Sequence, residues 1–169
     1  MGTRRVVTGH TPDGTAVIVS DEQVASYPIG ALGSAVTSLW GRDDPPHFPD
    51  DGARPSISTA FPPVGGSRLA IMELAPRGDD FDEFVRDELA TWADPKNPGM
   101  HRSPSIDYDI VLAGTVGLEL DDGTEVALSP GDVVVQNGTR HRWHNRGDGI
   151  ARIVSITIGG LHEMDGGSR

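Results

Sequence analysis

Residues that can bind a metal or move a proton are concentrated between residues 99 and 145, where His101, Asp107, Asp109 and His141 lie. Two imidazoles and one carboxylate form a ligand set for a divalent transition metal that keeps open coordination positions. If the fold brings them together, we expect His101, Asp107 and His141 to hold Fe, Mn, Ni, Co or Zn. The ligand set does not choose among these metals.

The alternation of side chains along a strand decides which of these residues share a face. Asp107 and Asp109 lie two positions apart, as do His141 and Trp143, so each pair shares a face if its segment is a strand. Inside a closed barrel the two faces would meet. Without a barrel the grouping is a weak indication, since any antiparallel sheet places some histidine near an aspartate.

Asp109 and Asp107 are the candidate catalytic residues. Asp109 is predicted to project into an otherwise apolar barrel, where burial raises the pKa of a carboxylic acid because the charged form loses its water. A raised pKa suits a general acid or base near neutral pH. In the alternative, Asp109 lies in water at the barrel mouth, or pairs with Arg68 or Arg152.

Four neighbouring residues are candidates for contacting a substrate: Ser103, Gln136, Arg140 and Trp143. Ser103 shares a face with His101 if the chain is extended there. Arg140 can hold a substrate carboxylate or remain a solvated turn residue. Trp143 can line a pocket or fill the core.

Short strands separated by turns are expected to position these residues, because the chain has 22 Gly and 13 Pro and many β-branched runs. A hairpin is predicted over 4–8 and 15–19, with an Asp-Gly turn between its strands, and a polar connection follows over 21–33. Further strands are predicted at 35–40, 68–74, 106–112, 115–120, 125–128, 132–136, 141–145 and 150–158.

Two segments depart from the strand pattern. The run from 42 to 60 is rich in Pro and Asp, which predicts a long loop that is disordered, a partner arm or a lid. Residues 79–92 combine acidic residues in a first turn with apolar side chains at helical spacing. They predict one helix, which either covers the sheet core or acts as a lid over a ligand.

The net charge and composition of the chain limit the class of protein. A formal net charge of −11 repels phosphate backbones, so we expect no nucleic-acid partner. The chain has no cysteine, which excludes disulfides, thiolate metal sites and cysteine nucleophiles. We find neither an apolar run long enough to span a membrane nor a cleavable leader, and we expect a cytoplasmic protein without a membrane partner.

Gly99-Met-His101-Arg-Ser103, followed by Asp107 and Gly114, resembles the first motif of the cupin superfamily, the small jelly-roll barrels. That motif has glycine, His-x-His, glutamate and a second glycine at this spacing. Here Ser103 stands in place of the second histidine and Asp107 in place of the glutamate. Because one ligand is replaced, we expect the metal to be weakly bound.

The second cupin motif is matched by Gly131, Gly138, His141 and Asn145, with one residue fewer after Gly131. Gln136 stands where the family has proline. The departures leave three outcomes for the site: a metal on the two histidines and one aspartate, a metal completed by Asp109 or His47, or a polar pocket that binds its ligand without metal.

The resemblance implies an all-β fold, an antiparallel jelly-roll (cupin) barrel with an N-terminal strand extension and one covering helix. In a small single-domain, RmlC-like cupin of this kind, 66–160 would form the barrel, 1–65 would extend it within the same domain and 161–169 would be a flexible tail. Many cupins are dimers that pair or exchange N-terminal strands. We therefore expect a homodimer, formed here through 4–8 and 15–19.

The same resemblance implies a metal-dependent enzyme acting on a small oxygenated or carboxylate-bearing molecule, as a decarboxylase, dehydratase, isomerase or cyclase. In such an enzyme the metal polarises an oxygen of the bound molecule while Asp109 moves a proton. Two alternatives stay open: an Fe(II) dioxygenase built on the same ligands, and a small-molecule-binding cupin without catalysis. The fold cannot decide between them, because one barrel hosts many functions.

Overall fold

The computed structural model describes residues 2–29, 33–76, 94, 96–97 and 99–163. This part of the chain forms eleven strands, and they pair in antiparallel fashion. Their bounds are β1 Thr3–His10, β2 Ala16–Val24, β3 Tyr27–Ile29, β4 Ser34–Arg42, β5 Ser67–Leu74, β6 Ser105–Ala113, β7 Val116–Leu120, β8 Glu125–Leu128, β9 Val133–Asn137, β10 His141–Asn145 and β11 Ala151–Gly159.

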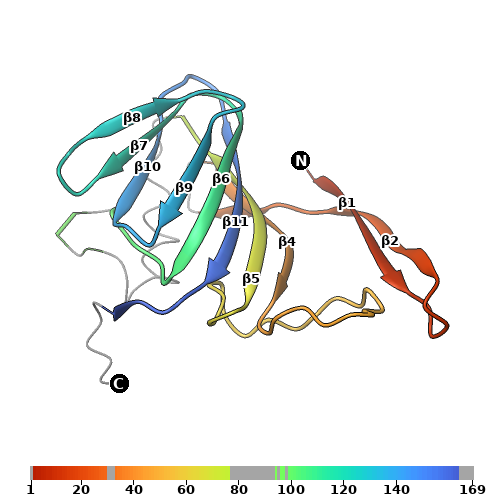
Figure 1. Ribbon diagram of the computed structural model, residues 1–169. Coiled ribbons are helices and arrows are strands. Elements are labelled where there is room, and N and C mark those ends of the chain that lie inside the picture. Colours follow the sequence, from red (N-terminus) through yellow and green to blue (C-terminus); the bar gives the residue numbers. More distant parts are fainter. Residues whose placement is uncertain (1, 30–32, 77–93, 95, 98, 164–169) are drawn as a thin grey trace.

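The strands form a six-stranded, a three-stranded and a two-stranded sheet. The largest sheet has the order β3-β4-β5-β11-β6-β9, and the three-stranded sheet has the order β10-β7-β8. Figure 1 shows these two sheets facing each other, and both contribute to one hydrophobic core. The predicted all-β, antiparallel jelly-roll fold is therefore confirmed, and it places β6 and β10 on opposite sheets around a shared interior.

The interior has an apolar end and a polar end. Along β6 the inward positions are Ser105, Asp107, Asp109 and Val111, and all four are buried. Since alternate side chains of a strand share a face, β6 directs three polar groups into one end of the interior and Val111 into the core. The core consists of Leu74, Val111, Val116, Leu118, Leu128, Trp143, Ala151 and Ile153.

The turn after β6 requires a glycine. Gly114 has a φ of +79°, a left-handed conformation that glycine adopts without steric cost. A Cβ at this position would lie 2.8 Å from the Cα of Ala151 on β11. This close approach lets the chain leave the six-stranded sheet and enter β7 of the facing sheet within a short turn.

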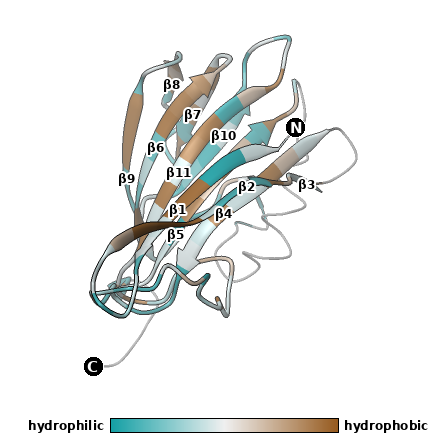
Figure 2. Cartoon of the chain, turned by 90° about the vertical axis from the view of Figure 1, so that its right-hand side faces the viewer, coloured by the Kyte–Doolittle hydropathy of each residue, from teal (hydrophilic) through white to brown (hydrophobic). Residues whose placement is uncertain are grey.

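The N-terminal strands β1 and β2 form a hairpin of their own, which projects from the barrel in Figure 1. The hairpin predicted over 4–8 and 15–19 is therefore confirmed. Figure 2 shows a hydrophobic stretch along this hairpin, and Val17, Ile18 and Val19 on β2 are exposed.

The connections differ from the prediction in one place. The polar connection predicted over 21–33 is wrong in part, because β2 continues to Val24 and β3 pairs with the start of β4. Residues 43–66, all of which the structure describes, contain no strand, as predicted for the long loop. The helix predicted over 79–92 lies outside the described residues. Nothing helical in the described part of the chain has the length and apolarity needed to cross a membrane.

Candidate active site in the barrel cavity

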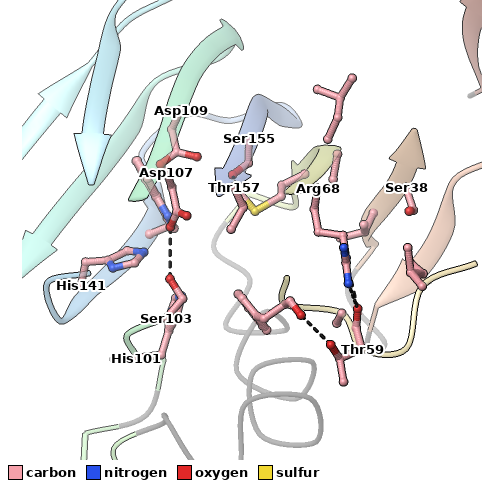
Figure 3. A pocket seen from close by; sticks show the side chains of 18 of the residues that line it. Ser38, Thr59, Arg68, His101, Ser103, Asp107, Asp109, His141, Ser155 and Thr157 are labelled. Atoms are coloured by element: carbon pink, nitrogen blue, oxygen red, sulfur yellow. Dashed lines mark hydrogen bonds between the residues drawn. The ribbon is translucent and has the colours of Figure 1, made fainter. Parts of the chain in front are cut away.

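A cavity of about 470 Å³ lies at the polar end of the barrel interior. Its walls come from β4, β5, β6, β10 and β11 and from residues 57–61 of the long loop. In Figure 3 the polar residues of β6 and the two histidines lie on one side of this cavity. The predicted site residues that line it are His101, Ser103, Asp107, Asp109, His141 and Trp143.

Asp107 is held by hydroxyl groups. Ser105 Oγ donates to Asp107 Oδ1 at 2.7 Å, and Ser103 Oγ donates to Asp107 Oδ2 at 3.2 Å. Burial raises the pKa of Asp107 above its ordinary value, and the hydroxyls of Ser105, Ser103 and Thr157 oppose this rise by stabilising the carboxylate. Ser103, at the position of a family histidine, therefore serves here as a hydrogen-bond donor to Asp107.

Asp109 is the more strongly perturbed carboxyl group. Its side chain is only 3% exposed, and it lies opposite Ser155 of β11 in the pairing of β6 with β11. Burial raises the pKa of Asp109 to about 7, a hydrogen bond from Ser155 works against the rise, and the charge of Asp107 adds to it. The group can therefore both accept and donate a proton near neutral pH.

His101 and His141 pack against each other on the same side of the cavity, with ring centroids 4.4 Å apart and ring planes tilted by 52°. Nδ1 of His101 lies 2.9 Å from the carbonyl oxygen of Gly99, and Nδ1 of His141 lies 3.0 Å from that of Thr139. Since a carbonyl oxygen only accepts, Nδ1 carries the proton in each ring and Nε2 carries the lone pair. Burial lowers the pKa of both rings, that of His141 to about 3, so both are neutral at physiological pH.

These donor types fit a divalent transition metal. Neutral histidines held at Nδ1 by backbone carbonyls are the usual form of metal-bound imidazole. The spacing differs from that of a bound metal, because the ligand atoms of His101, Asp107 and His141 do not all lie within 4.8 Å of one another, so binding would require one of these side chains to move.

A second group of possible ligands lies on the outer side of the three-stranded sheet. Glu119, Glu125 and His144 have ligand atoms within 4.8 Å of one another, and they are the one such group in the described residues. Glu119 and Glu125 are ion-paired with Arg142 and Arg146, respectively. Because arginines already neutralise both carboxylates, we regard this group as a surface charge network that could hold an ion only by displacing them.

Arg140 and Gln136, both predicted to contact a substrate, are not among the described residues that line the cavity. Arg140 forms ion pairs with Asp94 and Asp121. Gln136 is buried, and its Nε2 donates to the Thr139 carbonyl at 3.1 Å. The same carbonyl accepts from His141 Nδ1, so Gln136 supports the turn that orients His141.

Several cavity residues escaped the sequence analysis. Ser155 and Thr157 face the two aspartates because β11 pairs with β6 in a register that places Thr157 opposite Asp107. In the sequence, the spacing of Ser155 and Thr157 two positions apart on a predicted strand was the one indication that they share a face.

The arginine partners suggested for Asp109 pair with other carboxylates, Arg68 with Asp43 and Arg152 with Glu73. Trp143 both fills the core and lines the cavity, with its ring 5.9 Å from that of His141.

Comparison with known proteins agrees with this geometry. Residues 94–157 match the family model of the cupin domain. Phomopsin biosynthesis cluster protein D of Diaporthe leptostromiformis is 38% identical over 95 residues, which cover 56% of this chain and 41% of that protein. The cupin-domain-containing oxidoreductase srdB of Neurospora crassa is 25% identical over 144 residues, covering 85% of this chain and 66% of that protein.

Among solved structures, the cupin domain of Cnp3 from Schizosaccharomyces pombe has the same fold, with a TM-score of 0.50 at 10% identity over 96% of this chain and 90% of that one. Barrel, motifs and family match together define a cupin domain. Residues 94–157 therefore match a cupin domain, which confirms the resemblance drawn from the two motifs. It spans about two fifths of the length of the first curated relatives that it matches, 41% in each case.

The buried Asp109 carboxyl predicts an unusual dependence of stability on pH. With a pKa of 3.8 in the unfolded chain and about 7 in the folded protein, the folded state binds more protons between these values. Stability therefore falls as the pH rises from 4 to 8, by roughly 4 kcal/mol for this group alone. Urea unfolding of metal-free Asp109→Asn should lack this component, so the variant is more stable than wild type at pH 8.

The exposed Asp148 provides the matched control, and Asp148→Asn should keep the wild-type dependence on pH. If Asp109→Asn and wild type lose the same stability between pH 4 and pH 8, the Asp109 carboxyl does not have a raised pKa in the folded protein.

Proposed function

We propose that this protein is a metal-dependent cupin enzyme that transfers a proton on a small oxygenated molecule bound in the barrel cavity. The observation that supports this most strongly is a nearly fully buried carboxyl group, Asp109, on the cavity wall with a pKa of about 7. Burying a carboxyl group without an ionic partner destabilises the fold. Carboxyl groups of this kind are concentrated at functional sites, where their proton takes part in the reaction.

His101, His141 and Asp107 are the residues that would hold the metal. When bound, a divalent metal acts as a Lewis acid on an oxygen of the substrate, and Fe(II) would in addition support reaction with dioxygen. Both imidazoles are neutral, and the Gly99 and Thr139 carbonyls fix the orientation of their rings. Each ring therefore has Nε2 in the form that binds a metal.

Asp109 is proposed to take a proton from the bound molecule, and to return one to it, through its carboxylate oxygens. Ser155 and Thr157 stabilise the two carboxylates of β6 in their charged form, while the proximity of Asp107 favours the protonated form of Asp109. Trp143 is buried and lines the same cavity. Dehydration, isomerisation, cyclisation and decarboxylation all use a proton transfer beside a polarised oxygen.

An oxidation is the second candidate, and it rests on the relatives rather than on the cavity. Four of the matched proteins carry the name cupin-domain-containing oxidoreductase. The same two histidines and one aspartate would serve such a reaction if the metal is iron. Dependence of turnover on dioxygen separates the two candidates.

The proton-transfer role of Asp109 predicts hydrogen exchange in a bound ketone. The probe is 2-acetonaphthone in D₂O, and NMR follows the replacement of its methyl protons by deuterium. The metal-loaded protein should accelerate this exchange, and Asp109→Asn should reduce the acceleration by about 100-fold or more, because amide cannot act as the base.

Asp122→Asn, which alters an exposed turn residue between β7 and β8, should leave the exchange unchanged. Exchange no faster than in protein-free buffer would contradict the catalytic proposal and favour a cupin that binds small molecules without catalysis. Equal acceleration by wild type and Asp109→Asn would remove Asp109 from the mechanism.

We also propose that the protein is a homodimer formed through the β1–β2 hairpin. The hairpin projects from the barrel, and Ile18, near its turn, is 69% exposed. In light scattering the wild type should have about twice the mass of one 17.9 kDa chain, and Ile18→Glu should have the mass of a single chain. Val126→Glu, at an exposed position on β8, should keep the wild-type mass. A monomeric wild type, or equal dissociation by both variants, would contradict the proposal.

A further inference from the structure

The wall of the cavity opposite the acidic residues has a different chemistry. It is built by apolar side chains from β4, β5 and the long loop, including Val36, Leu69, Met72, Ile57 and Phe61. In Figure 3 the residues Arg68, Thr59 and Ser38 lie on this side, away from Asp107, Asp109 and His141. A molecule that fills the cavity therefore meets carboxyl and imidazole groups at one end and, at the other, a largely apolar surface interspersed with the hydroxyl groups of Ser38, Ser58 and Thr59.

Arg68 is the one arginine or lysine among the described residues that line the cavity, and its guanidinium group is fully occupied. Nε and Nη2 donate to the Thr59 carbonyl at 3.2 and 2.8 Å. Nη1 donates to the carbonyls of Arg42 and Ser67 at 2.8 and 2.9 Å, and Nη2 also donates to Asp43 at 2.6 Å. All five N–H groups of a guanidinium are thus used, and none remains for a ligand.

These bonds hold the loop segment 57–61 in place as part of the wall. Asp43, the ionic partner of Arg68, also accepts the backbone N–H and the hydroxyl of Ser58 at 2.9 and 2.8 Å. Gly41 makes room for this arrangement, because a Cβ there would lie 2.8 Å from Cδ of Arg68 and 3.1 Å from Cγ2 of Ile57. The apolar wall is therefore a fixed feature of the cavity.

We infer that the substrate has its oxygenated group at one end, facing Asp109 and the histidines, and an uncharged, apolar body at the other, packed between β4, β5 and residues 57–61. This inference rests on the proposed function and names its substrate class. A carboxylate or phosphate at the far end would lose its water without gaining a charged partner, which is strongly unfavourable. Arg68 is a positioning residue that shapes this specificity and does not bind an anion.

This substrate class is narrower than the oxygenated or carboxylate-bearing molecule expected from the sequence. A carboxylate-bearing molecule remains compatible only if the carboxylate is at the reacting end, where a metal would face it. Ring systems with a hydroxyl or carbonyl group at one end fit both walls and the volume of about 470 Å³.

The test compares two probes with the same reacting end. 2-Naphthol and 6-hydroxy-2-naphthoate share a phenolic hydroxyl and differ in a carboxylate at the far end of the ring system. Calorimetric titration of metal-free protein at pH 7.5 should show 2-naphthol binding at least about tenfold more tightly. Binding of both probes with equal affinity, tighter binding of the carboxylate, or binding of neither would overturn the inference.

A cation placed in the apolar wall should reverse the preference. Ile57 lines the cavity and is 40% exposed, so Ile57→Lys is expected to fold and to favour 6-hydroxy-2-naphthoate. Val64→Lys, at an exposed position outside the cavity lining, is the matched control and should keep the wild-type preference. An unchanged preference in Ile57→Lys would show that the ligand does not contact this wall.

These binding measurements need no turnover. If the probes bind as expected while the deuterium exchange fails, the catalytic proposal is wrong and the specificity of the cavity stands. If exchange occurs but the carboxylate probe binds as well as the neutral one, only the assignment of the substrate class is wrong.

Discussion

Two carboxyl groups on one strand, buried two residues apart in the same cavity, are the constraint on which the rest of this structure depends. Burying them without cationic partners opposes folding, because each charged form loses its water and the two repel each other. The protein meets this constraint differently at the two positions. Serine hydroxyls hold Asp107, whereas Asp109 is left with a pKa of about 7 and is partly protonated at neutral pH.

The barrel makes this arrangement possible by dividing its interior. On β6 the inward positions change from polar to apolar between Asp109 and Val111, and Val111 packs in a core to which both facing sheets contribute. The apolar end of the interior stabilises the fold, so the polar end can carry groups that destabilise it. The opposite wall is closed by a loop segment that Arg68 and Asp43 hold through a network of hydrogen bonds.

Much of the fold could be predicted from the sequence, because strands and turns are local features. The alternation along 106–112 and the turns that follow it predicted β6 to β11, and period two placed Asp109 and Asp107 on one inward face. What could not be predicted depends on contacts between distant segments. The register of β11 against β6 brings Ser155 to Asp109, and the bonds of Arg68 to Arg42, Asp43 and Thr59 become visible only when the long loop is in place.

We propose that His101, His141 and Asp107 form a metal site beside a proton-transferring Asp109. The most direct measurement is the metal content of untagged wild-type protein and of His141→Ala after reconstitution with Fe, Mn, Ni, Co or Zn, with circular dichroism to confirm that both are folded. We expect close to one divalent metal per wild-type chain and its loss in the variant. A folded wild type that binds no metal, or a variant that binds as much as wild type, would contradict it.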